Sequence, residues 1–186
     1  ILFMKLLCLM LALLAPVAVS GADDVNVTTS PDGTMEAFTR GGDLWVRDIA
    51  EAKEWALTTD GSDVILNGYA SWVYYEEILG RASFYKAFWW SPDSKKIGYY
   101  RFDNSKVPVF PIYSPFGQYG SLNLTRYPKA GDTNPEVTVR IADITDIRES
   151  GKPTSVDAAF DPGVDQYFGI PFWSSDSRSF YVAREP

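Results

Sequence analysis

Short segments that alternate apolar and polar residues follow one another along most of the chain after residue 22. They are rich in β-branched and aromatic residues and are bounded by turn sequences such as Pro31-Asp32-Gly33, Gly41-Gly42 and Asp60-Gly61. This pattern is typical of an antiparallel meander of short strands. The strands that we expect cover residues 35–39, 43–47, 55–58, 96–101, 137–144 and 179–182.

A weak internal repeat runs through these segments. Ser30-Pro31-Asp32-Gly33 recurs as Ser91-Pro92-Asp93-Ser94 and as Ser174-Ser175-Asp176-Ser177, and a strand-like segment follows each copy. An Asp side chain in such a turn can accept hydrogen bonds from nearby backbone amides, and repeated turns of this kind are typical of propeller blades. A β-sandwich would also have short strands, but the repeat favours a propeller. We therefore predict an all-β fold, a partial β-propeller of about two to three blades.

Two stretches depart from the β pattern. Residues 71–81 have apolar residues near helical spacing and Gly80 close to their end, which predicts a short helix or helical turn. Residues 108–132 are aromatic and interrupted by several Pro and Gly residues, and they are expected to form a long excursion from the strands. Excursions of this length inside a domain tend to be functional.

The first residues have the features of a secretory signal peptide. Met4-Lys5 precedes an apolar run over residues 6–19, and Ser20-Gly21-Ala22 supplies small residues for cleavage before Asp23. The run is shorter than the roughly 20 residues that span a bilayer. We expect residues 1–22 to be a signal peptide with translation starting at Met4, the mature domain to cover residues 23–186, and the protein to be secreted or periplasmic.

Composition excludes several classes of chemistry. The formal net charge of -7 argues against a nucleic-acid partner, because phosphate binding needs clustered Lys and Arg. The chain has no His, and Cys8 lies within the expected signal peptide, so neither a Ser-His-Asp triad, a thiol site nor a typical zinc site is expected. Asp32, Asp93 and Asp176 each stand alone in a turn, which favours turn closure over calcium binding. We therefore predict no catalytic residue, metal or cofactor in this chain.

Several motifs in a fixed order resemble one enzyme family. The segment Trp72-Val73-Tyr74-Tyr75-Glu76-Glu77 is followed by Phe88-Trp89-Trp90-Ser91-Pro92-Asp93-Ser94, then by Tyr99-Tyr100-Arg101-Phe102-Asp103 and by Arg126-Tyr127-Pro128-Lys129-Ala130-Gly131. Together they resemble the double-glutamate region of the N-terminal propeller of dipeptidyl peptidase IV-like serine peptidases. The resemblance covers about residues 44–144.

The resemblance implies a function for the adjacent glutamates. In that family an N-terminal propeller covers a catalytic α/β-hydrolase domain, and the enzyme releases dipeptides with Pro or Ala at the second position. Glu76 and Glu77 correspond to the pair that binds the free amine of the peptide substrate, since two carboxylates can share the three donors of an ammonium. Composition alone would instead place adjacent glutamates on a solvated helix face. Ser71 and Tyr75 depart from the family pattern, in which acids are common at both positions.

The chain is too short for a propeller and a hydrolase domain together. We therefore expect a fragment that lacks the α/β-hydrolase domain, is not catalytic itself, and has that domain and peptides with a free N-terminus as partners. A homodimer of the full-length parent is left open. The alternative functions are a non-enzymatic binding or scaffold propeller of the cell envelope and a peptidase relative without activity.

Overall fold

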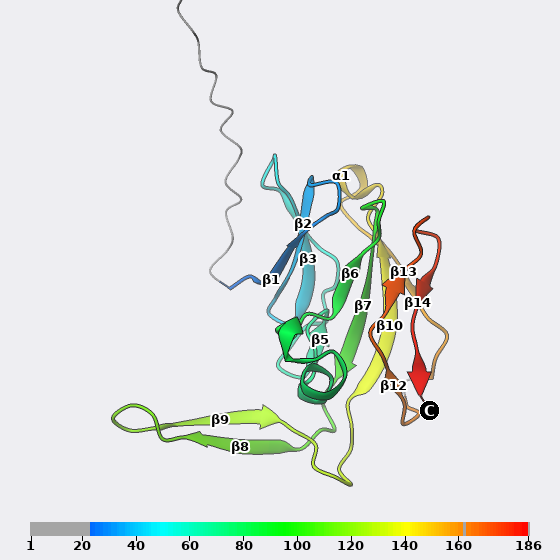
Figure 1. The fold of residues 1–186 in the computed structure, drawn as a ribbon. Helices are drawn as coiled ribbons and strands as arrows, with labels where there is room; N and C mark the ends of the chain where they lie inside the picture. The colour runs from blue at the N-terminus through cyan, green and yellow to red at the C-terminus, as the bar shows by residue number, and fades with distance from the viewer. Residues whose placement is uncertain (1–22, 162, 186) are drawn as a thin grey trace, which may run out of the picture.

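The computed structural model describes residues 23–161 and 163–185, and the expected signal peptide, residues 1–22, lies outside them. Its described part is built mainly of antiparallel strands, with a few short helical segments (Figure 1). Among these residues no helix has the length and apolar character that crossing a membrane requires. The expectation of a single mature domain over residues 23–186 stays a prediction.

The first sheet is a simple meander. Its strands pair in the order β1-β2-β3-β4. Their bounds are β1 (Val25–Thr29), β2 (Met35–Arg40), β3 (Asp43–Asp48) and β4 (Glu54–Ala56). Arg40 pairs with Asp43, so that Gly41 and Gly42 alone form the loop between β2 and β3, at φ values of 60° and 84°. A two-residue hairpin loop needs left-handed φ at such positions, which explains the two glycines.

The second sheet has two long central strands, β7 and β10. They pair over their full length, from Asp103 opposite Glu136 to Lys96 opposite Asp143. The order of strands is β11-β10-β7-β5, and β6 also pairs with β7. Their bounds are β5 (Ile65–Asn67), β6 (Phe88–Trp90), β7 (Lys96–Asp103), β10 (Glu136–Asp143) and β11 (Thr154–Asp157); the helical turn α1 (Ile147–Ser150) joins the last two.

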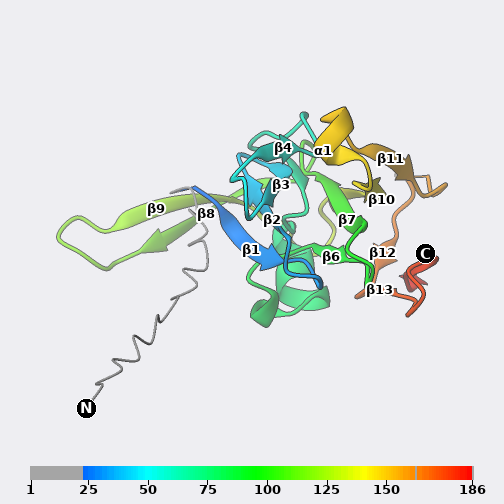
Figure 2. The same cartoon turned by 90° about the horizontal axis from the view of Figure 1, so that it is seen from above.

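The remaining strands form two-stranded pairs. In the C-terminal region β12 (Tyr167–Phe168) pairs with β15 (Arg184–Glu185), and β13 (Phe172–Trp173) pairs with β14 (Phe180–Tyr181). The hairpin of β8 (Val109–Ser114) and β9 (Ser121–Arg126) extends away from all the other sheets (Figures 1 and 2).

The sheets that carry the three repeat copies are called unit one (β1–β4), unit two (β5–β7, β10 and β11) and unit three (β12–β15). The repeat turns of the three units have the same geometry. In each, the serine hydroxyl donates to the Asp carboxylate two residues later at 2.6 Å. The same serine oxygen accepts a hydrogen bond from the backbone N–H five residues after the serine. The Asp carboxylate accepts a hydrogen bond from the backbone N–H two residues after the aspartate. The predicted role of Asp32, Asp93 and Asp176 in turn closure is therefore confirmed.

Two hydrogen bonds join each unit to its neighbour, and they are equivalent at the two junctions. Ser94 Oγ of unit two accepts the backbone N–H of Asp32 at 3.0 Å, and Ser177 Oγ of unit three accepts that of Asp93 at 3.0 Å. The indoles of Trp90 and Trp173 each donate, at 3.0 Å, to a backbone carbonyl of the preceding unit. The units are thus fixed in one register relative to each other.

Two buried clusters fill the space between the units. One joins unit one to unit two and includes Ala37, Leu44, Ile97 and Tyr99. The other joins unit two to unit three and to the helical segment, with Tyr74, Tyr100 and Phe168 among its members. A Cβ at Gly98 would lie 2.4 Å from the Phe180 ring, so only glycine lets unit three approach this closely.

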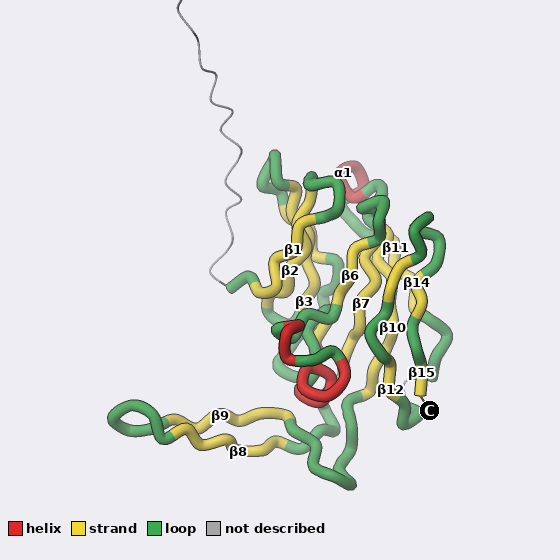
Figure 3. The backbone as a smooth tube through the Cα atoms, in the orientation of Figure 1, coloured by secondary structure: helices red, strands yellow, loops and turns green. Residues whose placement is uncertain are grey.

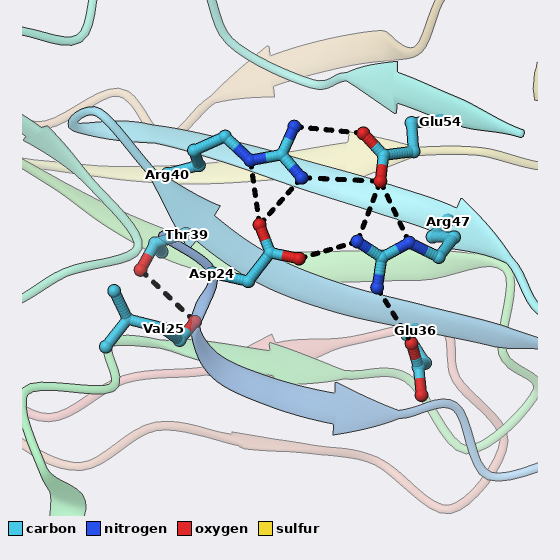
Figure 4. Close-up of polar contacts among 7 residues, drawn as sticks. All are labelled: Asp24, Val25, Glu36, Thr39, Arg40, Arg47 and Glu54. Atoms are coloured by element: carbon cyan, nitrogen blue, oxygen red, sulfur yellow. Dashed lines mark hydrogen bonds and ion pairs between the residues drawn. The ribbon is translucent and has the colours of Figure 1, made fainter. Parts of the chain in front are cut away.

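The opposite face of the first sheet carries charged residues instead of an apolar core. Arg47, whose side chain is 3% exposed, contacts Asp24 at 2.6 Å, Glu54 at 2.7 Å and Glu36 at 3.3 Å. Arg40 contacts the same Asp24 and Glu54 at 2.6 and 2.9 Å (Figure 4). Both guanidinium groups also lie over the ring of Phe38, with the Cζ of Arg40 4.9 Å and that of Arg47 4.5 Å from the ring centre. We call these five charged side chains the ion-pair network.

The structure confirms the predicted fold class and corrects one element. Each expected strand is present, although that expected over residues 55–58 is Glu54–Ala56 and that expected over 179–182 is Phe180–Tyr181. Residues 108–132, expected as a long excursion from the strands, contain the hairpin β8–β9. Pro111 concealed it, because proline is rare in strands except at edges, and a two-stranded hairpin consists of edges only.

Candidate functional site

The adjacent glutamates lie on a short helical segment, as predicted. The π-helical turn η1 (Tyr74–Ile78) contains both, and the 3-10 turn η2 (Arg81–Ser83) follows it; Figure 3 shows both turns in red. The backbone N–H of Leu79 donates to the carbonyl of Tyr74 at 2.7 Å, which is the wider hydrogen bonding of a π-turn. Single π-turns are frequent at functional sites.

Tyr74 fixes this segment to unit three. Its side chain is fully buried, and its hydroxyl accepts the backbone N–H of Phe168 at 3.0 Å. Its ring packs edge-on against Phe102 and Tyr100, with ring centres 4.9 and 6.2 Å apart. Burial raises the pKa of Tyr74 far above its ordinary value, so the hydroxyl stays neutral.

Glu76 is held by two neighbours on the same segment. The indole of Trp72 donates to Oε2 of Glu76 at 2.6 Å, and the guanidinium of Arg81 forms an ion pair with Oε1. Both carboxylate oxygens therefore already have a protein donor. Trp72 thus binds a carboxylate that lies on its own segment.

Glu77 lies on another side of the segment and borders a cavity of about 480 Å³. The cavity is open to solvent and lies between this segment and unit three. It is lined by Val73, Glu77, Ile78, Tyr167, Phe168, Gly169, Ala183 and Glu185. Glu77 is exposed and makes no ion pair or side-chain hydrogen bond with the residues that the structure describes. Its carboxylate is thus available to a cation that enters an otherwise largely apolar cavity.

The two glutamates therefore have different surroundings. Glu76 contacts Trp72 and Arg81, whereas Glu77 faces the cavity. Within the described part of the chain they share no contact, and their convergence on one amine stays a prediction. Glu185, which sequence reasoning missed, is a second carboxylate at the cavity of Glu77. No local pattern could have indicated it, because it lies far from Glu77 in the sequence and the fold brings it there.

Three arginines outside the helical segment have partners within the protein. Arg101 pairs with Asp60 at 2.8 Å, Arg140 pairs with Asp157 at 3.0 Å, and Arg126 donates to the carbonyl of Val107 at 2.7 Å. Among residues 23–161 and 163–185, no group of three or more His, Cys, Asp and Glu could hold a metal ion.

The order of the strands, the repeated turns and the acidic helical segment together define a partial β-propeller with a candidate cation site. Residues 14–184 match the family model for the dipeptidyl peptidase IV (DPP IV) N-terminal region. The chain belongs to this family.

Similar proteins agree with this assignment. A protein of Aspergillus clavatus named "Probable dipeptidyl peptidase 4" is 34% identical over 174 residues, which are 89% of this chain and 21% of that protein. A "Probable dipeptidyl-aminopeptidase B" of Talaromyces marneffei is 37% identical, over 62% of this chain and 14% of its own. The crystal structure of Porphyromonas gingivalis dipeptidyl peptidase 4 superposes with a TM-score of 0.69 at 29% identity, over 85% of this chain and 21% of that one. The chain thus spans about a fifth of the length of such relatives.

Proposed function

We propose that this chain is the substrate-recognition part of an exported dipeptidyl peptidase. The parent is a serine-type exopeptidase that releases N-terminal dipeptides with Pro or Ala at the second position, and its α/β-hydrolase domain performs the hydrolysis. This chain binds the free amine of the peptide. One observation carries the proposal: the carboxylate of Glu77 is unpaired among the described residues and lies at the wall of a cavity of about 480 Å³.

The chemistry of this cavity suits a peptide N-terminus. An ammonium group has three donors and forms charge-assisted hydrogen bonds with carboxylates, which an acylated or internal peptide cannot do. Val73 and Ile78 supply apolar walls next to Glu77, against which the first side chain of the peptide can pack. Glu77 therefore selects for a free amine, and the walls stabilise the residue that carries it.

Glu76 can join Glu77 only when Arg81 moves. The side chain of Arg81 is 70% exposed, and exposed ion pairs contribute only about 0–1 kcal/mol. A substrate ammonium can therefore replace Arg81 at Oε1 of Glu76, while Trp72 continues to hold Oε2. In this order of events Glu77 makes the first contact and Glu76 the second.

The test is kinetic and uses the full-length parent. Glu77→Gln removes the charge but keeps the size of the side chain, and we expect KM for a Xaa-Pro substrate to rise by about tenfold or more because a charge-assisted hydrogen bond is lost. Glu136→Gln is the matched control, since Glu136 forms an exposed pair with Lys106 and does not line this cavity. Unchanged kinetics of Glu77→Gln would contradict the proposal.

Export is part of the same proposal. It is supported by the apolar run over residues 6–19 and the small residues before Asp23. N-terminal sequencing of the protein recovered outside the cytoplasm should start at Asp23, and a start at Met4 there would contradict cleavage.

A further inference from the structure

A second cavity lies on the side of the helical segment where Trp72 points. Its volume is about 260 Å³. It is formed by the chain around β5, by the beginning of the helical segment, by the turn after β7 and by the end of β9. Its polar lining residues include Asp63, Ser71, Asn104 and Arg126. Val73 and Glu77 line the other cavity, so the helical segment separates the two.

Two buried polar atoms at this cavity have no partner in the protein. Ser71 and Asn104 are each 2% exposed, and both line the cavity. Ser71 Oγ and Asn104 Oδ1 have no hydrogen-bond partner among the residues that the structure describes. Buried polar atoms are nearly always hydrogen-bonded in folded proteins, so these two atoms are open to a ligand that supplies the missing bonds.

The edge of the cavity carries one charge of each sign. Asp63 is exposed and forms no ion pair with the described residues. One guanidinium nitrogen of Arg126 donates to the carbonyl of Val107 at 2.7 Å. Arg126 likewise forms no ion pair with the described residues. The remaining donors of Arg126 can bind a carboxylate, for which the planar guanidinium is well suited.

Aromatic residues give the cavity firm walls. Tyr85 stacks on Tyr69 with ring centres 4.9 Å apart and planes 1° from parallel. Trp72 is fixed by its hydrogen bond to Glu76 at 2.6 Å. These rings, with Leu66 and Leu124, can pack against an apolar side chain. The volume is below the range of roughly 300–1,000 Å³ that holds drug-sized ligands, which restricts the ligand to a smaller molecule.

We infer that this cavity binds a small zwitterion, a free α-amino acid or a dipeptide with an apolar side chain. The ammonium group donates to Asp63 and to Oδ1 of Asn104. The carboxylate accepts from Arg126 and from the hydroxyl of Ser71. The apolar side chain packs on the rings and leucines of the wall. This site is independent of the amine site proposed at Glu77, because the two cavities have no lining residue in common.

Calorimetric titration of the purified chain tests the inference with four probes. L-leucine and leucyl-leucine are zwitterions of different length, L-leucinamide lacks the carboxylate, and N-acetyl-L-leucine lacks the ammonium. We expect at least one zwitterion to bind and each blocked form to bind about tenfold more weakly or not at all, because each loses a charge-assisted interaction. Comparison of leucine with leucyl-leucine shows which length the cavity prefers.

Two substitutions locate the binding site without risk to the core. Asp63→Asn should weaken binding by about tenfold, while its control, Asp146→Asn at another exposed aspartate, should not. Arg126→Gln should also weaken binding by about tenfold. Its control is Arg178→Gln, at an arginine whose side chain is 86% exposed, which should leave binding unchanged. Glu77→Gln should leave this binding unchanged, which separates it from the proposed peptidase role.

Three results would overturn the inference. The first is the absence of binding by either zwitterion up to its solubility limit. The second is equal binding of leucinamide and leucine, which would show that no carboxylate is recognised. The third is loss of binding in Glu77→Gln but not in Asp63→Asn, which would place the ligand in the other cavity.

Discussion

The outer faces of unit one and unit three differ in how far their aromatic residues are covered from solvent. In unit one, the face of the sheet turned away from unit two is covered by the ion-pair network (Figure 4). Phe38, over whose ring both guanidinium groups lie, is fully buried. In unit three, Phe172 and Tyr181 stack with ring centres 5.2 Å apart but remain 63% and 51% exposed. Unit one thus covers its own apolar residues, whereas unit three leaves apolar surface available to a partner.

The difference shows two ways to complete a repeat. Long arginine side chains can cover an aromatic ring while their charged groups remain paired, and this makes a face that needs no neighbour. An aromatic face has no such cover and gains stability only through burial. The two faces should consequently respond differently to substitution and to pH.

The largest effect is expected from breaking the network at its centre. Arg47→Ala would leave Glu36 without a cation and Asp24 and Glu54 with Arg40 alone, and removing one partner of a buried ion pair typically costs about 3–5 kcal/mol. The free energy of unfolding from urea denaturation measures this. Arg178→Ala, at an exposed arginine of unit three, should change it by less than about 0.5 kcal/mol. Similar values for the two variants would show that the network does not stabilise unit one.

Acid should weaken unit one before unit three. Hydrogen bonds from Arg40, and to a lesser extent from Arg47, lower the pKa of Glu54 below its ordinary value. A lowered pKa in the folded state means that the unfolded chain binds more protons, so this stabilisation is complete above the unfolded pKa of about 4.3 and is lost as pH falls through the folded pKa.

Hydrogen exchange of the backbone amides tests the different acid sensitivity of unit one and unit three. Exchange rates are measured between pH 6 and pH 3 and corrected for the intrinsic rates, and the opening free energies of the two units are compared to an order of magnitude. Protection of β2 and β3 should fall more steeply than protection of β13 and β14. Glu54→Gln should reduce the extra pH dependence of the first sheet, to which Asp32 and Asp48, whose pKa values are also lowered, contribute the rest. An equal fall in both units would contradict the role of Glu54.

The smallest effect tests the junction between unit one and unit two. Ser94 has a left-handed φ of 61°, which is unfavourable for a residue other than glycine, and its hydroxyl accepts the N–H of Asp32. Ser94→Ala should lose about 1 kcal/mol because the bond is lost and the strain remains. Ser94→Gly should lose less, since glycine removes the strain. Unchanged stability and unchanged exchange of the Asp32 amide in Ser94→Ala would show that the hydroxyl is dispensable.

Local patterns were sufficient to predict the strands and the repeated turns. The alternation in residues 35–39 and 43–47 and the Ser-Pro-Asp turns depend on neighbouring residues, and the structure contains both. The ion-pair network was not predicted, because Asp24, Arg47 and Glu54 come from three different strands or their ends and only the register brings them together. The cavity shared by Glu77 and Glu185 was missed for the same reason.

The hydroxyl of Tyr74 has a consequence for how the glutamates are positioned. It binds the backbone of Phe168, so the segment that carries Glu76 and Glu77 is tied to a strand 94 residues further along the chain. A displacement of that strand would also displace the acidic turn, and the geometry of the proposed amine site is thereby coupled to the position of a distant part of the propeller.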